Sequence, residues 1–212
     1  MTQIAHDAIS GIILAGGKSR RMGRDKAFLE LGTKPLIRIV LEAIHTVVHE
    51  VFIVTNDPEH YTCFDVRLVE DIYHGLGKLG GIHAGLVAAT YDRALVVACD
   101  MPCLNPDLLR YLASLSPYYD AVVPRVDGLR EPLHAIYSRS CLGAIQAEID
   151  AGRREAYSFH SRVNTRYVER EELQRFDPSL LSLWNVNTPE DWQRAKTEYA
   201  RRFAGVVSWA QR

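Results

Sequence analysis

The stretch that decides the fold is Ile12–Ala27, I-I-L-A-G-G-K-S-R-R-M-G-R-D-K-A, in which a short apolar run passes directly into a glycine turn rich in cations. Its first residues have the β-branched and apolar side chains of a buried strand. Gly16 and Gly17 allow the backbone to turn tightly and bring its N–H groups close to an anion. Basic side chains follow at Lys18, Arg20, Arg21, Arg24 and Lys26. Because amide dipoles and cations together hold a polyphosphate, the stretch predicts a site for nucleotide phosphates.

Two common phosphate motifs do not fit this stretch. A Walker loop matches Gly17, Lys18 and Ser19 but requires a glycine where Ile12 stands, inside the predicted strand. A dinucleotide fingerprint does not fit either, because Gly16 and Gly17 are adjacent and basic residues follow them. The phosphate site is therefore of another kind.

The pattern that remains, L-A-G-G-x-S-x-R-M-G-x-D-K over residues 14–26, resembles the signature of nucleotidyltransferases with a GT-A-like Rossmann fold. It is most similar to that of the molybdenum cofactor guanylyltransferase family. The matching positions are Leu14, Ala15, Gly16, Gly17, Ser19, Arg21, Met22, Gly23, Asp25 and Lys26. The resemblance implies an α/β, three-layer Rossmann-like fold with a mostly parallel central sheet. An ordinary basic loop after a buried strand is the alternative, and it leaves these matches unexplained.

The composition of the whole chain agrees with a compact enzyme. With 212 residues, 47% of them hydrophobic, the chain is long enough for a single nucleotidyltransferase domain over 1–212. We expect a nucleotide-binding half at 1–105 and an acceptor-binding half at 106–212. The net charge of −1 argues against nucleic acid as a partner.

The sequence also predicts the compartment. The first residues lack the features of a signal peptide, and no apolar run approaches the ~20 residues of a membrane span, so no membrane contact is expected. The four cysteines show no pairing pattern, which is typical of a reducing compartment. We therefore expect a cytoplasmic protein.

Apolar runs alternate with helical patterns in the order of a mostly parallel sheet. The predicted strands are Ile9–Leu14, Val51–Thr55, Val66–Val69 and Ala94–Ala98, and the predicted helices include 36–48 and 82–89. Ligands of open α/β sheets bind beyond the carboxyl ends of the strands. Four residues that follow predicted strands are therefore expected to converge on one edge of the sheet: Gly16, Asn56, Asp71 and Asp100.

Asp100 follows the apolar run A-L-V-V-A-C without a break. A carboxylate at a strand end is a hard oxygen ligand that can hold Mg²⁺ against the phosphates of a nucleotide. A turn-forming aspartate is the alternative, and the presence of Lys26 and the glycine loop favours the metal. Asp71 resembles an acidic residue that contacts the nucleotide in the family, although aspartates are also common caps at strand ends.

A second glycine turn, G-L-G-K-L-G-G-I at 75–82, is similar to the family's G-P-L-G-G-I segment. The resemblance implies a position beside the guanine and ribose, with Gly80 in the nucleotide-binding set. Lys78 replaces the family's proline, so we expect a looser turn and weaker support for a preference for GTP over CTP. The alternative is that Gly80 and Gly81 only allow close helix packing.

The second half of the chain resembles the family over 127–137, where Glu131, Pro132 and Leu133 match best. His134 alternates with apolar residues in a predicted strand, so we interpret it as a packed histidine and not as a base. Three arginines are candidates for assisting a pterin phosphate, or else parts of a solvated charged face: Arg153, Arg154 and Arg166.

The segment N-V-N-T-P-E-D at 185–191 combines two signals. Its last four residues have the spacing of a helix cap, with Thr188 as N-cap and Asp191 completing a capping box. Asn185 and Asn187 are predicted to face one side of an extended segment. The pair resembles the family's N-x-N, which implies that both bind the acceptor and that Asn187 also helps to hold the metal.

The helix that follows is predicted to end at Gly205 and to pack one apolar face against the core. That face contains Trp192, Ala195, Tyr199 and Phe203.

The resemblance implies transfer of GMP from GTP to the phosphate of molybdopterin, which forms molybdopterin guanine dinucleotide and pyrophosphate. In this role Arg21 and Lys26 would stabilise the triphosphate, Asp100 would hold Mg²⁺, and the backbone of 14–17 would cradle the nucleotide. Transient contact with cofactor-delivery or molybdoenzyme proteins is compatible with it.

Two alternatives stay open at the level of the sequence. One is a cytidylyltransferase or sugar-phosphate nucleotidyltransferase of the same fold. The other is a non-catalytic module that delivers a nucleotide or cofactor. The carboxylate of Asp100 argues against the second, because binding alone would not need a metal ligand at the phosphates.

Overall fold

The centre of the molecule is an eight-stranded sheet, seen in a computed structural model that describes residues 8–16, 26–73 and 75–207. The strand order is β10-β7-β9-β6-β1-β4-β5, with β8 paired to β7. These strands are β1 (Ile9–Leu14), β4 (Glu50–Val54), β5 (Arg67–Val69), β6 (Arg93–Ala98), β7 (Ala121–Val126), β8 (Leu129–Arg130), β9 (His134–Ser138) and β10 (Thr165–Glu169). A separate hairpin consists of β2 (Glu30–Leu31) and β3 (Lys34–Pro35).

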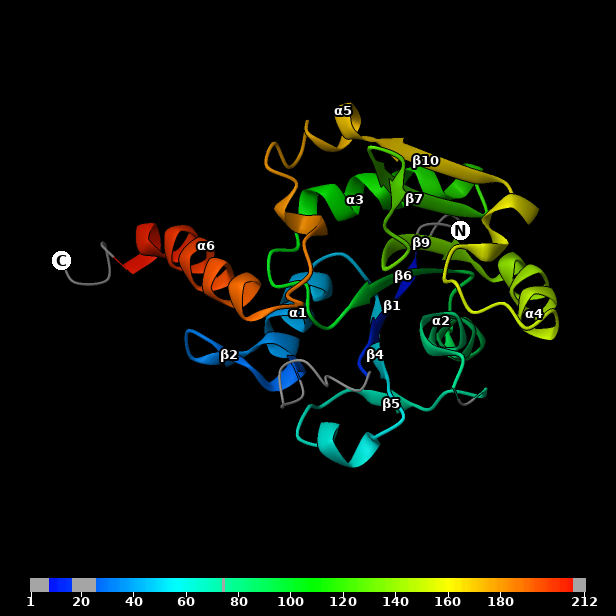
Figure 1. Cartoon of the computed structure of the whole chain (residues 1–212), viewed down its shortest axis with the longest axis horizontal. Coiled ribbons are helices and arrows are strands. Elements are labelled where there is room, and N and C mark those ends of the chain that lie inside the picture. The colour runs from blue at the N-terminus through cyan, green and yellow to red at the C-terminus, as the bar shows by residue number, and fades with distance from the viewer. Residues whose placement is uncertain (1–7, 17–25, 74, 208–212) are drawn as a thin grey trace, which may run out of the picture.

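The helices surround this sheet (Figure 1). They are α1 (Leu36–His45), α2 (Gly77–Ala88), α3 (Pro106–Leu115), α4 (Leu142–Asp150), α5 (Arg170–Leu173) and α6 (Pro189–Val207). Within the described ranges, none of the helices combines the length and apolar composition that crossing a membrane requires.

The sheet is mostly parallel, as the sequence predicted. Strands β6, β1, β4 and β5 run parallel to one another, and β10 runs parallel to β7. Strand β9 is antiparallel to both β6 and β7, so it joins the two halves of the chain into one continuous sheet. Pattern reading placed a strand at His134 but did not predict this reversal.

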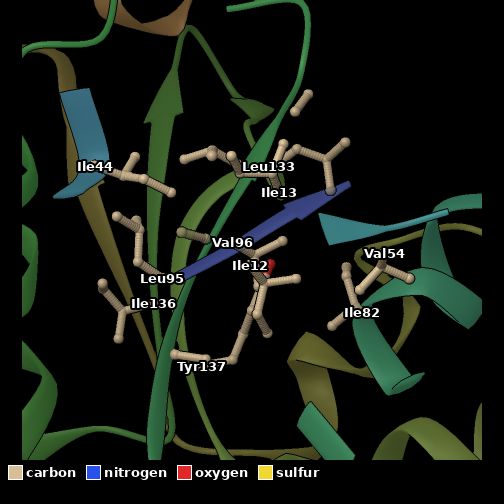
Figure 2. Packing of buried hydrophobic residues seen from close by; sticks show 14 of the residues in the cluster. Ile12, Ile13, Ile44, Val54, Ile82, Leu95, Val96, Leu133, Ile136 and Tyr137 are labelled. Carbon is tan, nitrogen blue, oxygen red and sulfur yellow. The ribbon is translucent and has the colours of Figure 1, made fainter. Parts of the chain in front are cut away.

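Helices α1 and α2 lie on opposite faces of β1. A Cβ on Gly11 would lie 2.9 Å from Val48 and 3.2 Å from Ile44, at the end of α1 and just beyond it. A Cβ on Gly85, in α2, would lie 2.8 Å from the neighbouring strand residue Ile12. Because successive strand residues point to opposite faces, the sheet is covered on both sides. Figure 2 shows Ile44 and Ile82 on either side of Ile12 and Ile13 in the core.

Helix α2 corrects one expectation. It begins at Gly77, five residues before the predicted start, so Lys78 lies in its first turn and not in a loosened loop. Gly75 and Gly77 adopt φ values of +84° and +58°, which favour glycine and complete the turn before the helix. A Cβ on Gly81 would lie 3.2 Å from Leu14, so the close-packing alternative is confirmed for this position.

Helix α6 departs from the prediction in two ways. It continues through Gly205 to Val207, because a glycine weakens a helix without obligatorily ending it. It also packs beside the main core instead of closing it, in a smaller cluster with the β2–β3 hairpin. The buried members of that cluster are Leu31, Leu36, Val186 and Ala195. Figure 1 shows α6 extending away from the sheet, and the side chain of Phe203 lies outside the described residues.

Candidate functional site

The register of the parallel strands places the predicted polar residues in one row. Leu14 pairs with Val54 on one side and with Ala98 on the other, and Val54 pairs with Val69. The residues two positions beyond these partners are Gly16, Asn56, Asp71 and Asp100. The predicted convergence on one edge of the sheet is therefore confirmed as geometry.

Asn56 and Asp71 form a polar pair at this edge. The side-chain amide of Asn56 donates to Asp71 Oδ2 at 2.9 Å, and the backbone N–H of Asp71 donates to Asn56 Oδ1 at 3.3 Å. Helix α2 lies close by, since a Cβ on Gly80 would be 3.8 Å from Asp71 Oδ2. It would also meet the carbonyl oxygen of Tyr73 at 3.2 Å. Gly80 thus leaves space for a ligand or a backbone beside this pair.

A second polar group brings together residues from the two halves of the chain. Lys26 Nζ donates to Asn187 Oδ1 at 2.9 Å and lies 3.6 Å from Asp100 Oδ2. The side chains of Lys26 and Asp100 are only 15% and 17% exposed. We call Lys26, Asp100 and Asn187 the charged triad of this edge. Lys26 begins a short 3₁₀ turn, Lys26–Phe28, which follows the stretch of sequence predicted to bind phosphates.

The segment that carries Asn187 is held in place by its own sequence. The backbone N–H of Val186 donates to the carbonyl of Asp100 at 2.9 Å. Asp191 accepts from the backbone N–H groups of Asn187 and Thr188, each at 2.9 Å, and Thr188 Oγ1 caps Asp191 in return at 3.1 Å. The predicted capping box is therefore confirmed. It fixes the backbone at Asn187, whose side chain accepts the hydrogen bond from Lys26.

Burial dominates the electrostatics of the charged triad. It raises the pKa of Asp100, while the charges of Lys26 and Lys78 act in the opposite direction. A carboxylate that is buried this way gains from a further cation. Asp100 and Asn187 both offer hard oxygen atoms, which are the ligands that Mg²⁺ prefers. The donor set of this structure therefore fits a magnesium ion.

Several candidates from the sequence fall elsewhere. Within the described residues, Asn185 makes its side-chain hydrogen bond to the carbonyl of Leu183 at 3.4 Å and not to the charged triad. Gly17 and Arg21 lie outside the described residues, whereas Leu14, Ala15 and Gly16 continue β1 toward the edge. Ala15 donates from its backbone N–H to the carbonyl of Val54 at 2.9 Å.

His134 is a packed residue, as predicted. It is fully buried, and Nε2 lies 2.8 Å from Ser182 Oγ. Burial lowers its pKa to about 4. Two of the three arginines proposed for a phosphate are also occupied, because Arg153 pairs with Glu148 and Arg166 with Glu172.

Sequence reasoning did not assign a cavity of about 430 Å³ near the start of α2. Lys78, Glu131 and Arg154 are among its lining residues. The signals available were the departure of Lys78 from the family pattern and the match of Glu131 to it, but neither indicated a shared space. Only the antiparallel β9, which directly follows Leu133, brings the segment of Glu131 beside α2.

A mostly parallel α/β sheet with a lysine–aspartate–asparagine group at the carboxyl edge of its strands, together with the glycine-rich and basic sequence that follows the first strand, is typical of nucleotidyltransferase enzymes. The comparison with protein families agrees: the profile of the MobA-like NTP transferase domain matches residues 11–165. The chain belongs to this family.

Individual relatives extend the match over most of the chain. A probable molybdenum cofactor guanylyltransferase of Pelotomaculum thermopropionicum is 41% identical over 187 residues, covering 88% of this chain and 91% of the relative. A molybdenum cofactor guanylyltransferase of Desulfosudis oleivorans is 36% identical, covering 90% and 95%. The crystal structure of molybdopterin-guanine dinucleotide biosynthesis protein A from Archaeoglobus fulgidus has a TM-score of 0.81 at 31% identity, covering 91% of this chain and 100% of that one.

Proposed function

We propose that this enzyme transfers GMP from GTP to the phosphate of molybdopterin, forming molybdopterin guanine dinucleotide and releasing pyrophosphate. The observation that carries the proposal is the charged triad, in which Lys26 lies between Asp100 and Asn187 at the edge where Asn56 and Asp71 also pair. The names of the relatives supply the acceptor and the base.

The proposed reaction needs no general base. A phosphate oxygen of the acceptor attacks the α-phosphorus of GTP, and the bond from that phosphorus to the bridging oxygen of the β-phosphate breaks. The nucleophile is already an anion, so no side chain has to remove a proton from it. Catalysis then consists of alignment and charge stabilisation.

The nucleotide side of the reaction belongs to the first half of the chain. The backbone of 14–17 would cradle the phosphates, and Asn56 with Asp71 would hydrogen-bond the nucleoside beside Gly80. Lys26 and Arg21 would stabilise the triphosphate and the pyrophosphate that leaves. Lys26 is well placed for this role, because its ammonium group is held by Asn187 within a largely buried site.

Asp100 and Asn187 would hold Mg²⁺. When bound, this ion neutralises phosphate charge at the reacting centre. Asp100 carries the full negative charge of the pair, and its burial makes a cationic partner favourable. Asn187, whose oxygen faces Lys26, orients that lysine as well.

The acceptor side belongs to the second half. Asn187 and Asn185 belong to the segment that docks on Asp100 through Val186, so they would meet the acceptor where it approaches the α-phosphate. The two halves share one sheet, which keeps the two substrates in a fixed relation.

The test is release of pyrophosphate from the purified full-length protein with Mg²⁺ and molybdopterin, comparing GTP, CTP, ATP and UTP. We expect release with GTP only, and none without the acceptor. A preference for CTP would assign the chain to cytidylyl transfer with the same fold. Binding of GTP without release under any condition would contradict catalysis and favour a delivery module.

A further inference from the structure

Two segments of the chain are joined to each other beside the charged triad. The first segment, 100–105, begins with Asp100 and leads into α3, and the second, 182–187, ends with Asn187. At one end, the backbone N–H of Val186 donates to the carbonyl of Asp100 at 2.9 Å. At the other end, the backbone N–H of Asn105 donates to Ser182 Oγ at 2.9 Å. The two segments therefore run in opposite directions and are joined at both ends.

Ser182 makes the junction that is farther from the charged triad, and it is fully buried. Besides accepting from Asn105, its hydroxyl oxygen lies 2.8 Å from Nε2 of His134. A serine hydroxyl can accept one hydrogen bond and donate another, so it can donate to the imidazole. Burial lowers the pKa of His134 to about 4, so the ring is neutral at neutral pH and Nε2 can accept. Because His134 belongs to β9, Ser182 also joins both segments to the central sheet.

The backbone around Ser182 is held by further hydrogen bonds. Its N–H donates to Oδ2 of the buried Asp177 at 2.7 Å, and Asn105 Nδ2 donates to the carbonyl of Phe176 at 2.8 Å. Between them, Leu180 adopts a φ of +53°, which residues other than glycine rarely adopt. Such a conformation persists only where surrounding contacts hold it. Tertiary contacts therefore decide where Ser182 lies.

The second junction restricts how the segment 182–187 can move. The bond from Val186 to Asp100 is a single hydrogen bond, and a segment held at one point can still pivot about it. The bond from Asn105 to Ser182 fixes a second point and thereby the direction of the segment. Groups at a reacting centre have to be held within about 0.5 Å of their working positions. Asn187, at the end of this segment, depends on both points.

We propose that Ser182 is a positioning residue for the reacting centre. By joining the segment 182–187 to the segment 100–105 and to β9, its hydroxyl sets the distance between Asp100 and Asn187. The inference rests on the proposed function for the roles of these two residues at the metal and the acceptor. Ser182 acts through Asn187, and His134, which is not a base, holds the hydroxyl in place.

The first experiment measures amide hydrogen exchange in the full-length protein without ligands. In Ser182→Ala, we expect the amides of Val186 and Asn187 to exchange about tenfold faster, because a lost buried hydrogen bond changes the local opening equilibrium by about this factor. The amides of β1 should change less, since that strand is paired on both sides.

The second experiment measures pyrophosphate release as a function of Mg²⁺ concentration. In Ser182→Ala, we expect the Mg²⁺ concentration for half-maximal rate to rise about fivefold and kcat to fall about fivefold, because the two oxygen ligands are misaligned. KM for GTP should stay within about twofold, since the Asn56–Asp71 pair is untouched. A general loss of structure would lower the amount of active enzyme without changing its response to Mg²⁺.

The matched control is Ser116→Ala, at the opposite end of α3 from Asn105. Ser116 is also buried, and its hydroxyl donates to the carbonyl of Ala113 at 2.7 Å. This variant should keep the exchange rates at Val186 and Asn187 and the response to Mg²⁺. Ser182→Cys keeps a weak donor and acceptor and should recover part of the rate. If a thermal melt shows Ser182→Ala unfolded, the same measurements on Ser182→Cys decide.

Unchanged exchange at Val186 and Asn187, or an unchanged response to Mg²⁺, would overturn the proposal, as would equal effects in Ser116→Ala. The exchange measurement does not depend on turnover. Faster exchange in Ser182→Ala, in a protein that releases no pyrophosphate with any nucleotide, would uphold the junction between the segments and reject the proposed reaction. Normal turnover by the original protein with unchanged exchange in Ser182→Ala would do the reverse.

Discussion

The two ends of the central sheet differ in how closely their charged side chains are paired. At the end built from β6, β1, β4 and β5, Lys26 lies 3.6 Å from Asp100 and both side chains are largely buried. At the end built from β7 and β10, arginines pair closely with carboxylates. Arg166 contacts Glu172 at 2.7 Å, and Arg125 forms an ion pair with Glu169.

Glu148 of α4 shows the same contrast most clearly. Its side chain is 2% exposed and accepts from both Arg153 and Arg162. The hydrogen bond from Arg153 is the largest factor that holds its pKa down to about 2, whereas burial raises the pKa of Asp100. Charges that are fully matched stabilise the fold, and charges that are incompletely matched are available to a ligand.

Removing the carboxylate of Asp100 should have the largest effect on activity. We expect Asp100→Ala to lower pyrophosphate release by about 10³-fold, since a metal ligand contributes several kcal/mol to the transition state. Burial disfavours the charged form, so unfolding temperature should stay the same or rise. Initial rates with Mg²⁺ and a thermal melt check both parts. Normal turnover in this variant would reject Asp100 as the metal ligand.

Replacing Lys26 should have the next largest effect. We expect Lys26→Ala to reduce kcat/KM for the nucleotide by about 10²-fold, because one preorganised cation next to the phosphates is lost. Lys26→Arg keeps the charge and should recover part of the rate. Steady-state kinetics at saturating acceptor give the measurement. Equal rates for the alanine and arginine variants would show that the charge is irrelevant.

Glu148 should matter for stability and not for turnover. We expect Glu148→Gln to lower the free energy of unfolding by about 2 kcal/mol at neutral pH, because two charge-assisted hydrogen bonds are weakened. Urea denaturation measures this change. A matched control is Glu198→Gln on α6, whose pair with Arg201 is more exposed on the arginine side and should change stability by less than about 1 kcal/mol.

The pH dependence of the Glu148 effect has a defined sign. The pKa of Glu148 is about 2 in the folded protein against an ordinary 4.5, so its contribution is complete above about pH 4.5 and is lost as pH falls toward 2. The difference in unfolding free energy between the original protein and Glu148→Gln should be constant from neutral pH to about 5 and shrink below that. A difference that grew on acidification would contradict the ion pairing.

Asn187 should have the smallest effect on turnover of the three residues of the charged triad, because it acts partly through Lys26. We expect Asn187→Ala to lower kcat about tenfold, from misplacement of the ammonium group by the lost 2.9 Å hydrogen bond and from a weaker metal site. If the lysine is its main partner, the double variant with Lys26→Ala should be little slower than Lys26→Ala alone. Fully additive effects would show that the two residues act independently.

Much of the fold could be predicted because its signals are local. The boundaries of β1 match the predicted strand at both ends, and the four parallel strands appear where apolar runs predicted them. The helix cap at Thr188 and Asp191 could also be predicted, since it depends on two residues that are three positions apart. The start of α2 was predicted five residues late because the glycines at 80 and 81 resemble a turn until their neighbours are known.

The candidate site divides in the same way. The row of Gly16, Asn56, Asp71 and Asp100 could be predicted, because parallel strands align their carboxyl ends and each residue follows a recognisable strand. The contact of Lys26 with Asn187 could not be predicted, because 161 positions separate the two residues and no local pattern brings them together.

The sequence by itself determined the class of fold and the residues that end the parallel strands, since each depends on side chains that are neighbours along the chain. The phosphate loop stays a prediction of the same local kind. Only the tertiary structure decided which charged side chains are paired within the protein and which can still interact with a ligand. It paired Glu148 with two arginines, left the carboxylate of Glu131 facing a cavity, and carried α6 away from the main core onto the β2–β3 hairpin. The physical reason is that burial and pairing depend on positions in space, which residues far apart in the chain define together. For Glu131, that position depends on β9, which runs antiparallel to β6.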